Sequence, residues 1–179
     1  MQWESLRLFV MTHGGIEKEE FLNMYNVPVL VQQKRRGVPI KVLYQIPEAR
    51  EKIIQLDKLE RLELLKFEGA KDIQDVFLFL PFGKGKEEIF IGSDSSNDIP
   101  MNLPWTSSRH AKISKNHMGL YTLTDLDSKE GTYLNEKKLY PGVDYPIGDF
   151  NQIVFGKSIK FFFLTPHGLF DYLRVLANI

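Results

Sequence analysis

Residues 120–135 read LYTLTDLDSKEGTYLN, two strand-like runs on either side of a polar turn. In the first run apolar and polar side chains alternate, as they do along a strand with one buried face. The turn at 127–131 consists of small and charged residues, which are typical of tight connections. This stretch therefore predicts antiparallel strands joined by short loops.

The same pattern extends over residues 75–166. The other strand-like runs are VFLFLPF (76–82), EEIFIGS (87–93), DIPM (98–101), HAKISK (110–115), TYLNEKKL (132–139) and NQIVFGKSIKFFFLT (151–165). At least seven short strands within about ninety residues, separated by Gly, Asn, Asp and Ser, are typical of a β-sandwich. We therefore predict a mainly β fold, with the sandwich over residues 71–165.

The beginning of the chain has a mixed pattern, which predicts a small α+β segment over residues 1–70. THGGIEKEEFLNMY (12–25) indicates a short helix with Thr12 as its cap. VPVLVQQKRRGVPIKVLYQI (27–46) indicates a hairpin, in which the prolines confine the strands to edges or starts.

Two further segments have helical spacing. Residues 47–68 place Ile53 and three leucines on one stripe, although the end of this helix could alternate as a strand. The stripe is interpreted as core, with a dimer seam as the alternative. Residues 166–179 predict a C-terminal helix, docked on the sandwich or joined to the N-terminal segment.

The composition argues against several function classes. Lys plus Arg and Asp plus Glu are 23 each, so the chain lacks the basic excess of a nucleic-acid-binding domain. The absence of cysteine removes disulfides, thiolate zinc sites and a cysteine nucleophile. No apolar stretch is long enough to span a bilayer, so we expect no membrane insertion and a cytoplasmic location.

The constellations of an enzyme are also missing. The four histidines are scattered, and no zinc-protease, serine-hydrolase or nucleotide-loop motif occurs. The glycine-rich GKGK at 83–86 lies between two predicted strands and indicates a hairpin turn. Asp94, Asp98, Asp125 and Asp127 are interpreted as turn residues, whose side chains bond the local backbone. We therefore expect no catalytic residue, no metal site and no cofactor.

Three polar loops recur between the predicted strands. They are IGSDSSNDI (91–99), WTSSRHA (105–111) and DLDSKEGTYLN (125–135). Consecutive strands of a sandwich often return their loops to the same end, so these three can converge. Hydroxyls, backbone amides and cations gathered in this way suit a dianionic phosphate.

These loops resemble those of the forkhead-associated (FHA) domain, a family that recognises phosphothreonine peptides. The family pattern is Gly-Arg in the first loop, Ser-x-x-His in the second and Asn-Gly-Thr in the third. This chain has Gly92-Ser93, then Ser107-Ser108-Arg109-His110, then Glu130-Gly131-Thr132, with matching order over residues 75–165. The resemblance implies a non-enzymatic protein-interaction module of signalling or assembly, whose partner in the family is phosphorylated on threonine.

Two departures from the family pattern affect the phosphate site. Ser93 replaces an arginine that is implied to hold the phosphate or its loop, and Glu130 replaces an asparagine that is implied to bond the peptide backbone. Losing a charge-assisted hydrogen bond costs about 1.5–3 kcal/mol. A carboxylate close to a dianion adds about 1 kcal/mol of repulsion. These departures predict impaired phosphothreonine recognition.

Other loop residues could offset the loss. Ser107 is retained and is implied to bond the phosphate, and Ser108, Arg109 and Lys129 lie beside it in the sequence. Either cation could reach a phosphate, and Lys129 could neutralise Glu130. A solvated turn pair of Lys129 and Glu130 is the simpler interpretation.

The retained histidine, His110, is implied mainly to brace the loops, with Gly92 and Gly131 at their turns. Trp105 precedes the hydroxyl run of the second loop. It is either an exposed interface anchor or a residue that packs beneath the loop.

Three hypotheses follow. The favoured one is an FHA-like module with impaired phosphothreonine recognition, which binds a protein partner through these loops or another face. The second is a working phosphothreonine reader that uses Ser107, Arg109 and Lys129. The third is a structural unit that forms a homodimer.

Overall fold

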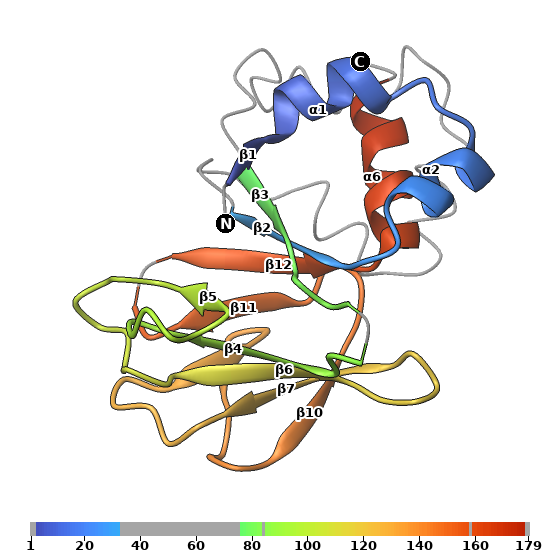
Figure 1. Ribbon diagram of the computed structural model, residues 1–179. Coiled ribbons are helices and arrows are strands. Elements are labelled where there is room, and N and C mark those ends of the chain that lie inside the picture. Colours follow the sequence, from blue (N-terminus) through green and yellow to red (C-terminus); the bar gives the residue numbers. More distant parts are fainter. Residues whose placement is uncertain (1–2, 33–75, 84, 158, 178–179) are drawn as a thin grey trace.

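The computed structural model describes residues 3–32, 76–83, 85–157 and 159–177, which form two facing β-sheets with three helices on one side (Figure 1). The predicted mainly β sandwich is confirmed. In Figure 1 the helices lie above the larger sheet, and the smaller sheet lies below it. The larger sheet is therefore the middle one of three layers.

The larger sheet is antiparallel throughout. In spatial order it contains β1 (Glu4–Ser5), β3 (Val76–Phe79), β2 (Val29–Gln32), β12 (Lys160–Leu164), β11 (Gln152–Phe155), β8 (Thr132–Leu134) and β9 (Lys137–Lys138). Its central strands are rich in Val and Phe, which favour a pleated, buried surface. Val31 of β2 stands opposite Phe77 on one side and Phe162 on the other.

The smaller sheet contains, in spatial order, β10 (Asp144–Ile147), β7 (Tyr121–Asp125), β6 (Ala111–Lys115), β4 (Glu88–Gly92) and β5 (Ile99–Pro100). Among the described strands of this sheet, only β4 and β5 pair in parallel. Strand β10 was not predicted from the sequence, because its Pro146 argues against a strand. An edge strand tolerates proline, because its second side needs no backbone donor.

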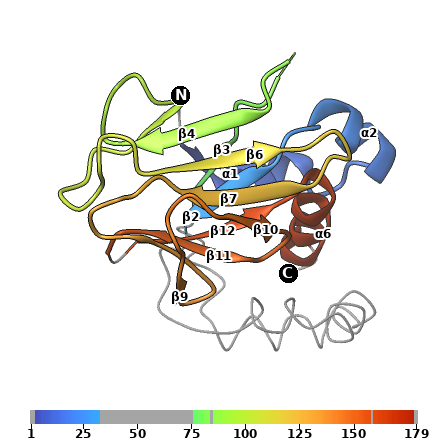
Figure 2. The same cartoon turned by 90° about the horizontal axis from the view of Figure 1, so that it is seen from below.

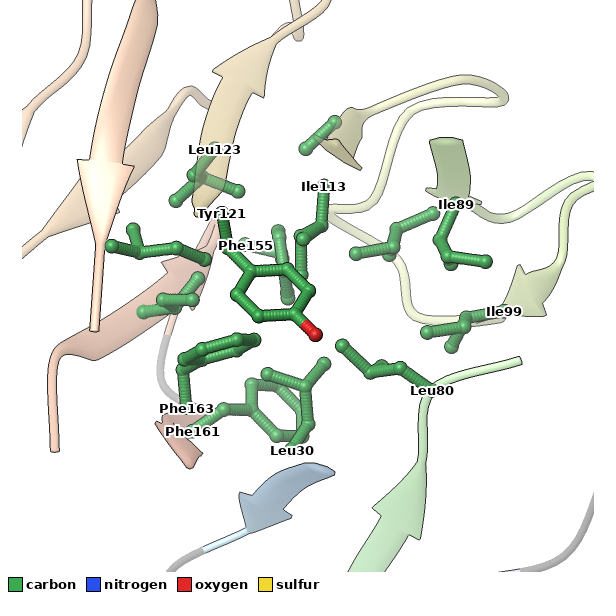
Figure 3. Packing of buried hydrophobic residues seen from close by; sticks show 14 of the residues in the cluster. Leu30, Leu80, Ile89, Ile99, Ile113, Tyr121, Leu123, Phe155, Phe161 and Phe163 are labelled. Carbon is green, nitrogen blue, oxygen red and sulfur yellow. The ribbon is translucent and has the colours of Figure 1, made fainter. Parts of the chain in front are cut away.

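Side chains between the two sheets form the core of the sandwich (Figure 3). Tyr121 of β7 packs on Phe163 of β12 across this space, with ring centroids 5.2 Å apart. Leu30 of β2 is fully buried in the same cluster. The N-terminal part of the chain therefore supplies part of the sandwich core.

A second core lies between the larger sheet and the helices α1 (Leu6–His13), α2 (Lys18–Met24) and α6 (Pro166–Ala177). Successive side chains of a strand point to opposite faces. Phe161 and Phe163 of β12 thus enter the sandwich core, whereas Phe162 and Leu164 face the helices. Burial on both faces explains the unbroken apolar run of this strand.

The described part of the predicted segment 1–70 is not separate from the sandwich, because β2 pairs with β3 and β12. Pro28 precedes β2, in agreement with a proline at a strand start. The second half of the predicted hairpin, the helix at 47–68 and the boundary at residue 70 lie outside the described residues.

The helix predictions are partly confirmed. A helix does cover Phe21 and Leu22, but Thr12 is not its cap. Thr12 lies inside α1, where its hydroxyl donates to the carbonyl of Leu8 at 3.1 Å, and Ser5 caps that helix instead. The C-terminal helix α6 begins at Pro166, packs on the larger sheet and contacts both α1 and α2, so both alternatives for its docking hold.

The strand directions bring three loops to one end of the sandwich (Figure 2). β4 and β7 are both antiparallel to β6, so they end where β6 begins. We call the loops that meet there the loop rim, residues 93–98, 101–110 and 126–131.

Candidate functional site

The first two loops of the rim are joined backbone to backbone. The Ser93 N–H donates to the carbonyl of Ser107 at 2.9 Å, and the Asp94 N–H donates to that of Ser108 at 3.2 Å. The Asn97 side chain, 7% exposed, also donates to the Ser108 carbonyl at 2.6 Å. A Cβ at Gly92 would overlap the same carbonyl oxygen. Glycine is therefore required where these two loops cross.

His110 connects the second loop to the third. Its ring is fully buried and accepts the Ser107 N–H at Nδ1, 3.1 Å away. Since Nδ1 is an acceptor, the ring proton is on Nε2, which donates to the Gly131 carbonyl at 3.2 Å. Burial lowers the pKa of His110, although the bond to Gly131 and the charge of Asp125 act in the opposite direction. The histidine is thus held neutral, between the two loops.

Asp125 organises the third loop, which the sequence analysis did not foresee. Its carboxylate is 1% exposed and accepts three hydrogen bonds: the Ser128 N–H at 3.1 Å, the Ser128 hydroxyl at 2.6 Å and the Thr132 hydroxyl at 2.5 Å. It is a turn-forming aspartate, as interpreted, but a buried one at the end of β7. The signal was its place at the end of an alternating strand, three residues before a serine.

Ser107 lies where the second and third loops meet. Its hydroxyl oxygen accepts the Lys129 N–H at 2.9 Å. A serine hydroxyl has one proton besides its lone pairs, so Ser107 can still donate to a ligand. Ser108 and Lys129 are exposed beside it, and Ser93 is half-buried. The structure thus brings together the rim residues that the sequence singled out, with one exception.

Arg109 is the exception. Its guanidinium lies over the ring of Phe90, 4.0 Å from the centroid, on the outer face of β4. Asp98 is close to it: burial would raise the pKa of this carboxyl, but hydrogen bonds from Lys86 and the Phe90 N–H, and the charges of Lys86 and Arg109, lower it. A guanidinium on an aromatic face is favourable by about 0.5–1 kcal/mol at exposed sites. Arg109 therefore packs on Phe90 and does not take the place of the family's arginine at position 93.

Glu130 has a partner that the sequence analysis did not identify. Its carboxylate accepts from the ammonium group of Lys157 at 2.8 Å. This hydrogen bond lowers the pKa of Glu130, and the charges of Lys157, Lys129 and Lys138 add to the effect, whereas desolvation opposes it. Lys129 thus acts on Glu130 through its charge, and the ion pair itself is made by Lys157.

Trp105 packs beneath the rim. A Cβ at Gly156 would lie only 2.6 Å from the indole Cδ1, and the indole Nε1 is buried. Of the two alternatives for Trp105, the structure therefore favours a residue that packs beneath the loop over an exposed interface anchor.

Neither a metal centre nor a membrane span can be assigned to the described part of the chain. Across residues 3–32, 76–83, 85–157 and 159–177, no three His, Asp or Glu side chains are grouped so that they could hold a metal ion. None of the described helices has the length and apolar character needed to cross a membrane.

Residues 89–156 match the family model of the FHA domain. A search of curated proteins finds no match.

Solved structures similar to the chain include two isolated FHA domains. One is from an Arabidopsis thaliana protein, with 26% identity, a TM-score of 0.44, and coverage of 50% of this chain and 73% of that one. The other is from the Chlamydia trachomatis protein CT664, with 24% identity, a TM-score of 0.42, and coverage of 49% and 83%.

A third similar structure is Mycobacterium tuberculosis EmbR, solved in complex with a low affinity phosphopeptide. It has 23% identity and a TM-score of 0.40, and the match covers 44% of this chain and 20% of EmbR. The match thus spans about a fifth of the length of EmbR.

Proposed function

On the premise that residues 89–156 are an FHA domain, we propose that this protein binds a protein partner through the loop rim, with weakened recognition of phosphothreonine. FHA domains are non-enzymatic modules that bind phosphothreonine peptides of partner proteins. The proposal gives this chain the same class of partner and the same surface. It differs from the family in how much of the affinity depends on phosphate.

The observation that carries the proposal is the position of Arg109. The family's first-loop arginine is Ser93 here, so a nearby cation would have to replace it. Arg109 instead lies over Phe90, close to Asp98. A charge-assisted hydrogen bond to phosphate contributes about 1.5–3 kcal/mol. Without it, a module that binds at a micromolar dissociation constant loses at least about tenfold in affinity.

A specific observation favours the second candidate, a working phosphothreonine reader. The Ser107 hydroxyl accepts the Lys129 N–H and keeps its own proton for a ligand. Lys157 also binds Glu130, which reduces the repulsion that this carboxylate exerts on a phosphate. Part of the phosphate site is therefore compatible with a bound phosphate. The two candidates differ in how much the phosphate contributes to the binding affinity.

Titration with a phosphothreonine peptide library and its unphosphorylated twin separates the candidates. We expect the phosphorylated library to bind less than about fivefold more tightly, which corresponds to less than about 1 kcal/mol. A preference of a hundredfold or more, abolished by Ser107→Ala and by Lys129→Ala, would establish the reader instead. Ser114→Ala, which removes a hydroxyl from the opposite end of β6, serves as the matched control.

Placing the family's arginine in the first loop should strengthen phosphate binding. Ser93→Arg is expected to raise the affinity for the phosphorylated library about tenfold and to leave the unphosphorylated twin unchanged. Ser95→Arg adds the same charge at an exposed position of the same loop and should change both affinities equally. If the two variants behave alike, the loss at position 93 does not explain weak recognition.

The homodimer stays a prediction, because the leucine stripe of residues 53–62 lies outside the described residues. A dimer seam would make the solution mass of the full chain twice that of the monomer. Leu56→Gln with Leu59→Gln should then return a monomer, as measured by light scattering. A monomeric wild type would contradict the seam.

A further inference from the structure

Three lysines from separate parts of the sequence surround Glu130 at the third loop. Lys157 donates to its carboxylate at 2.8 Å, and the charges of Lys129 and Lys138 also act on it. All three lysines are exposed. With three positive charges and one negative charge, the group has a net charge of +2, although the whole chain is neutral. Positive charge is thus concentrated at one part of the rim.

Backbone contacts hold this group together. The Lys129 N–H donates to the Ser107 hydroxyl at 2.9 Å, which ties that lysine to the second loop. The Gly156 N–H donates to the Gly131 carbonyl at 2.9 Å, which places Lys157 next to the third loop. The positions of two of the lysines therefore follow from the fold of the domain, and do not depend on their flexible side chains alone.

Lys138 reaches the group by crossing Gly131. A Cβ at Gly131 would overlap the Lys138 Cε and would lie 3.1 Å from its Nζ. The side chain of Lys138 therefore lies directly over the glycine, with its ammonium group beside the loop. The neighbouring strand residue, Lys137, points to the opposite face, because successive side chains of a strand alternate.

We propose that Lys129, Lys138 and Lys157 form an anion-binding subsite, which takes an acidic side chain of the partner beside Ser107, and that Glu130 is the internal counter-ion which this side chain displaces. This inference rests on the proposed use of the loop rim, and it specifies the chemistry of the partner. The partner's anionic group is either a carboxylate or a phosphorylated side chain, since both match clustered ammonium groups. No covalent bond is made or broken in the exchange: the hydrogen bond from Lys157 to Glu130 is replaced by one to the incoming anion.

The exchange has a measurable consequence for affinity. A carboxylate that already occupies the lysine group competes with the partner, so its removal should strengthen anion binding. Exposed ion pairs are weak, because water and salt screen the two charges. Glu130→Gln should therefore raise the affinity for an acidic peptide by up to about fivefold. Binding should also weaken steeply as salt increases, because exposed charges are screened.

The test uses the full chain, observed by amide chemical shifts, with peptides that contain no phosphothreonine. The probes are hexaglutamate, a hexapeptide with two phosphoserines, and hexaglutamine. We expect hexaglutamate to shift the amides of residues 129–131, 138 and 157, and hexaglutamine to shift none of them. If only the phosphoserine peptide binds there, the ligand is a phosphorylated side chain, and if both bind, it is any anionic one.

Matched variants complete the test. Lys138→Gln with Lys157→Gln should reduce the hexaglutamate affinity at least about fivefold, whereas Lys137→Gln, on the opposite face of the same strand, should leave it unchanged. Equal losses in both variants, or no anion-dependent shift at the rim, would overturn the subsite. If the wild type binds no anion at the rim but Ser93→Arg still raises the affinity for the phosphorylated library, the subsite is refuted and the proposed function stands. If the wild type binds anions at the rim but no rim variant changes the affinity for a protein partner, the proposed function is refuted and the subsite stands.

Discussion

Replacing Gly92 by alanine is expected to lower the free energy of unfolding by about 2–4 kcal/mol. The new Cβ would overlap the Ser108 carbonyl oxygen and would lie 2.8 Å from the Asn97 Nδ2. The first obstacle is backbone, so it cannot move aside as the end of a flexible side chain can. The crossing must open, and the hydrogen bonds from Ser93 and Asn97 to the second loop lengthen or break.

Chemical denaturation of the full chain measures the free energy, and thermal denaturation measures the melting temperature. For a chain of this length, each 1 kcal/mol lowers the melting temperature by about 2–4 °C, so a decrease of roughly 5–15 °C is expected. Gly148→Ala is the control, because nothing lies within 4 Å of a Cβ at that position. It should change the stability by less than about 0.5 kcal/mol. Equal effects of the two substitutions would mean that the loop crossing is not close-packed in solution.

Gly92 also illustrates what the sequence could predict. The glycine, the serine of the second loop and the histidine three residues later follow a pattern with fixed order, so the meeting of the loops could be predicted. The strands between them could be predicted too, because alternation and turn residues are local features. Strand β10 was missed, since Pro146 argues against a strand unless the strand lies at an edge.

The middle layer could not be predicted in the same way. β2 lies between β3 and β12, and its partners are distant in the chain. A run such as Val29-Leu30-Val31 indicates a strand, but it does not indicate which strands flank it. Strand β12 is buried on both faces, in keeping with the unbroken run Phe161-Phe162-Phe163-Leu164. A helix docked on the sandwich was expected at the C-terminus, but the sequence did not indicate that α1, α2 and α6 together cover this strand.

The charged residues of the rim were the hardest to predict. Sequence distance favours a pair of Lys129 with Glu130, but the ion pair forms with Lys157 because the β11–β12 turn lies beside the third loop. Arg109 was one of two cations that could reach a phosphate, and its guanidinium lies over Phe90, nineteen residues earlier in the chain. The partner of an exposed side chain depends on tertiary contacts, and the spacing of residues along the sequence does not reveal these.

Substituting His110 by alanine is expected to destabilise the protein by about 3 kcal/mol. The fully buried ring fills space next to Phe155, with centroids 5.9 Å apart, so its loss leaves a cavity. Its loss also leaves the Ser107 N–H and the Gly131 carbonyl without the bonds at 3.1 and 3.2 Å. His110→Gln keeps a neutral donor and acceptor, and it should restore part of the stability in denaturation experiments.

The same bonds predict how stability depends on pH. Protonation of His110 would put a proton on Nδ1, facing the Ser107 N–H, so the folded state resists it, and burial lowers its pKa below the ordinary 6.5. Because the unfolded chain binds this proton first, the contribution of His110 to stability is complete above pH 6.5 and is lost as the pH falls below it.

Urea midpoints measured at pH 7.5 and pH 5.5 test this dependence. The midpoint should decrease more between these pH values in the wild type than in His110→Gln. His117→Gln changes an exposed hairpin histidine and should keep the full decrease. Identical decreases in the wild type and His110→Gln would show that His110 is protonated in the folded protein as easily as in the unfolded one, which is incompatible with its place between the two loops.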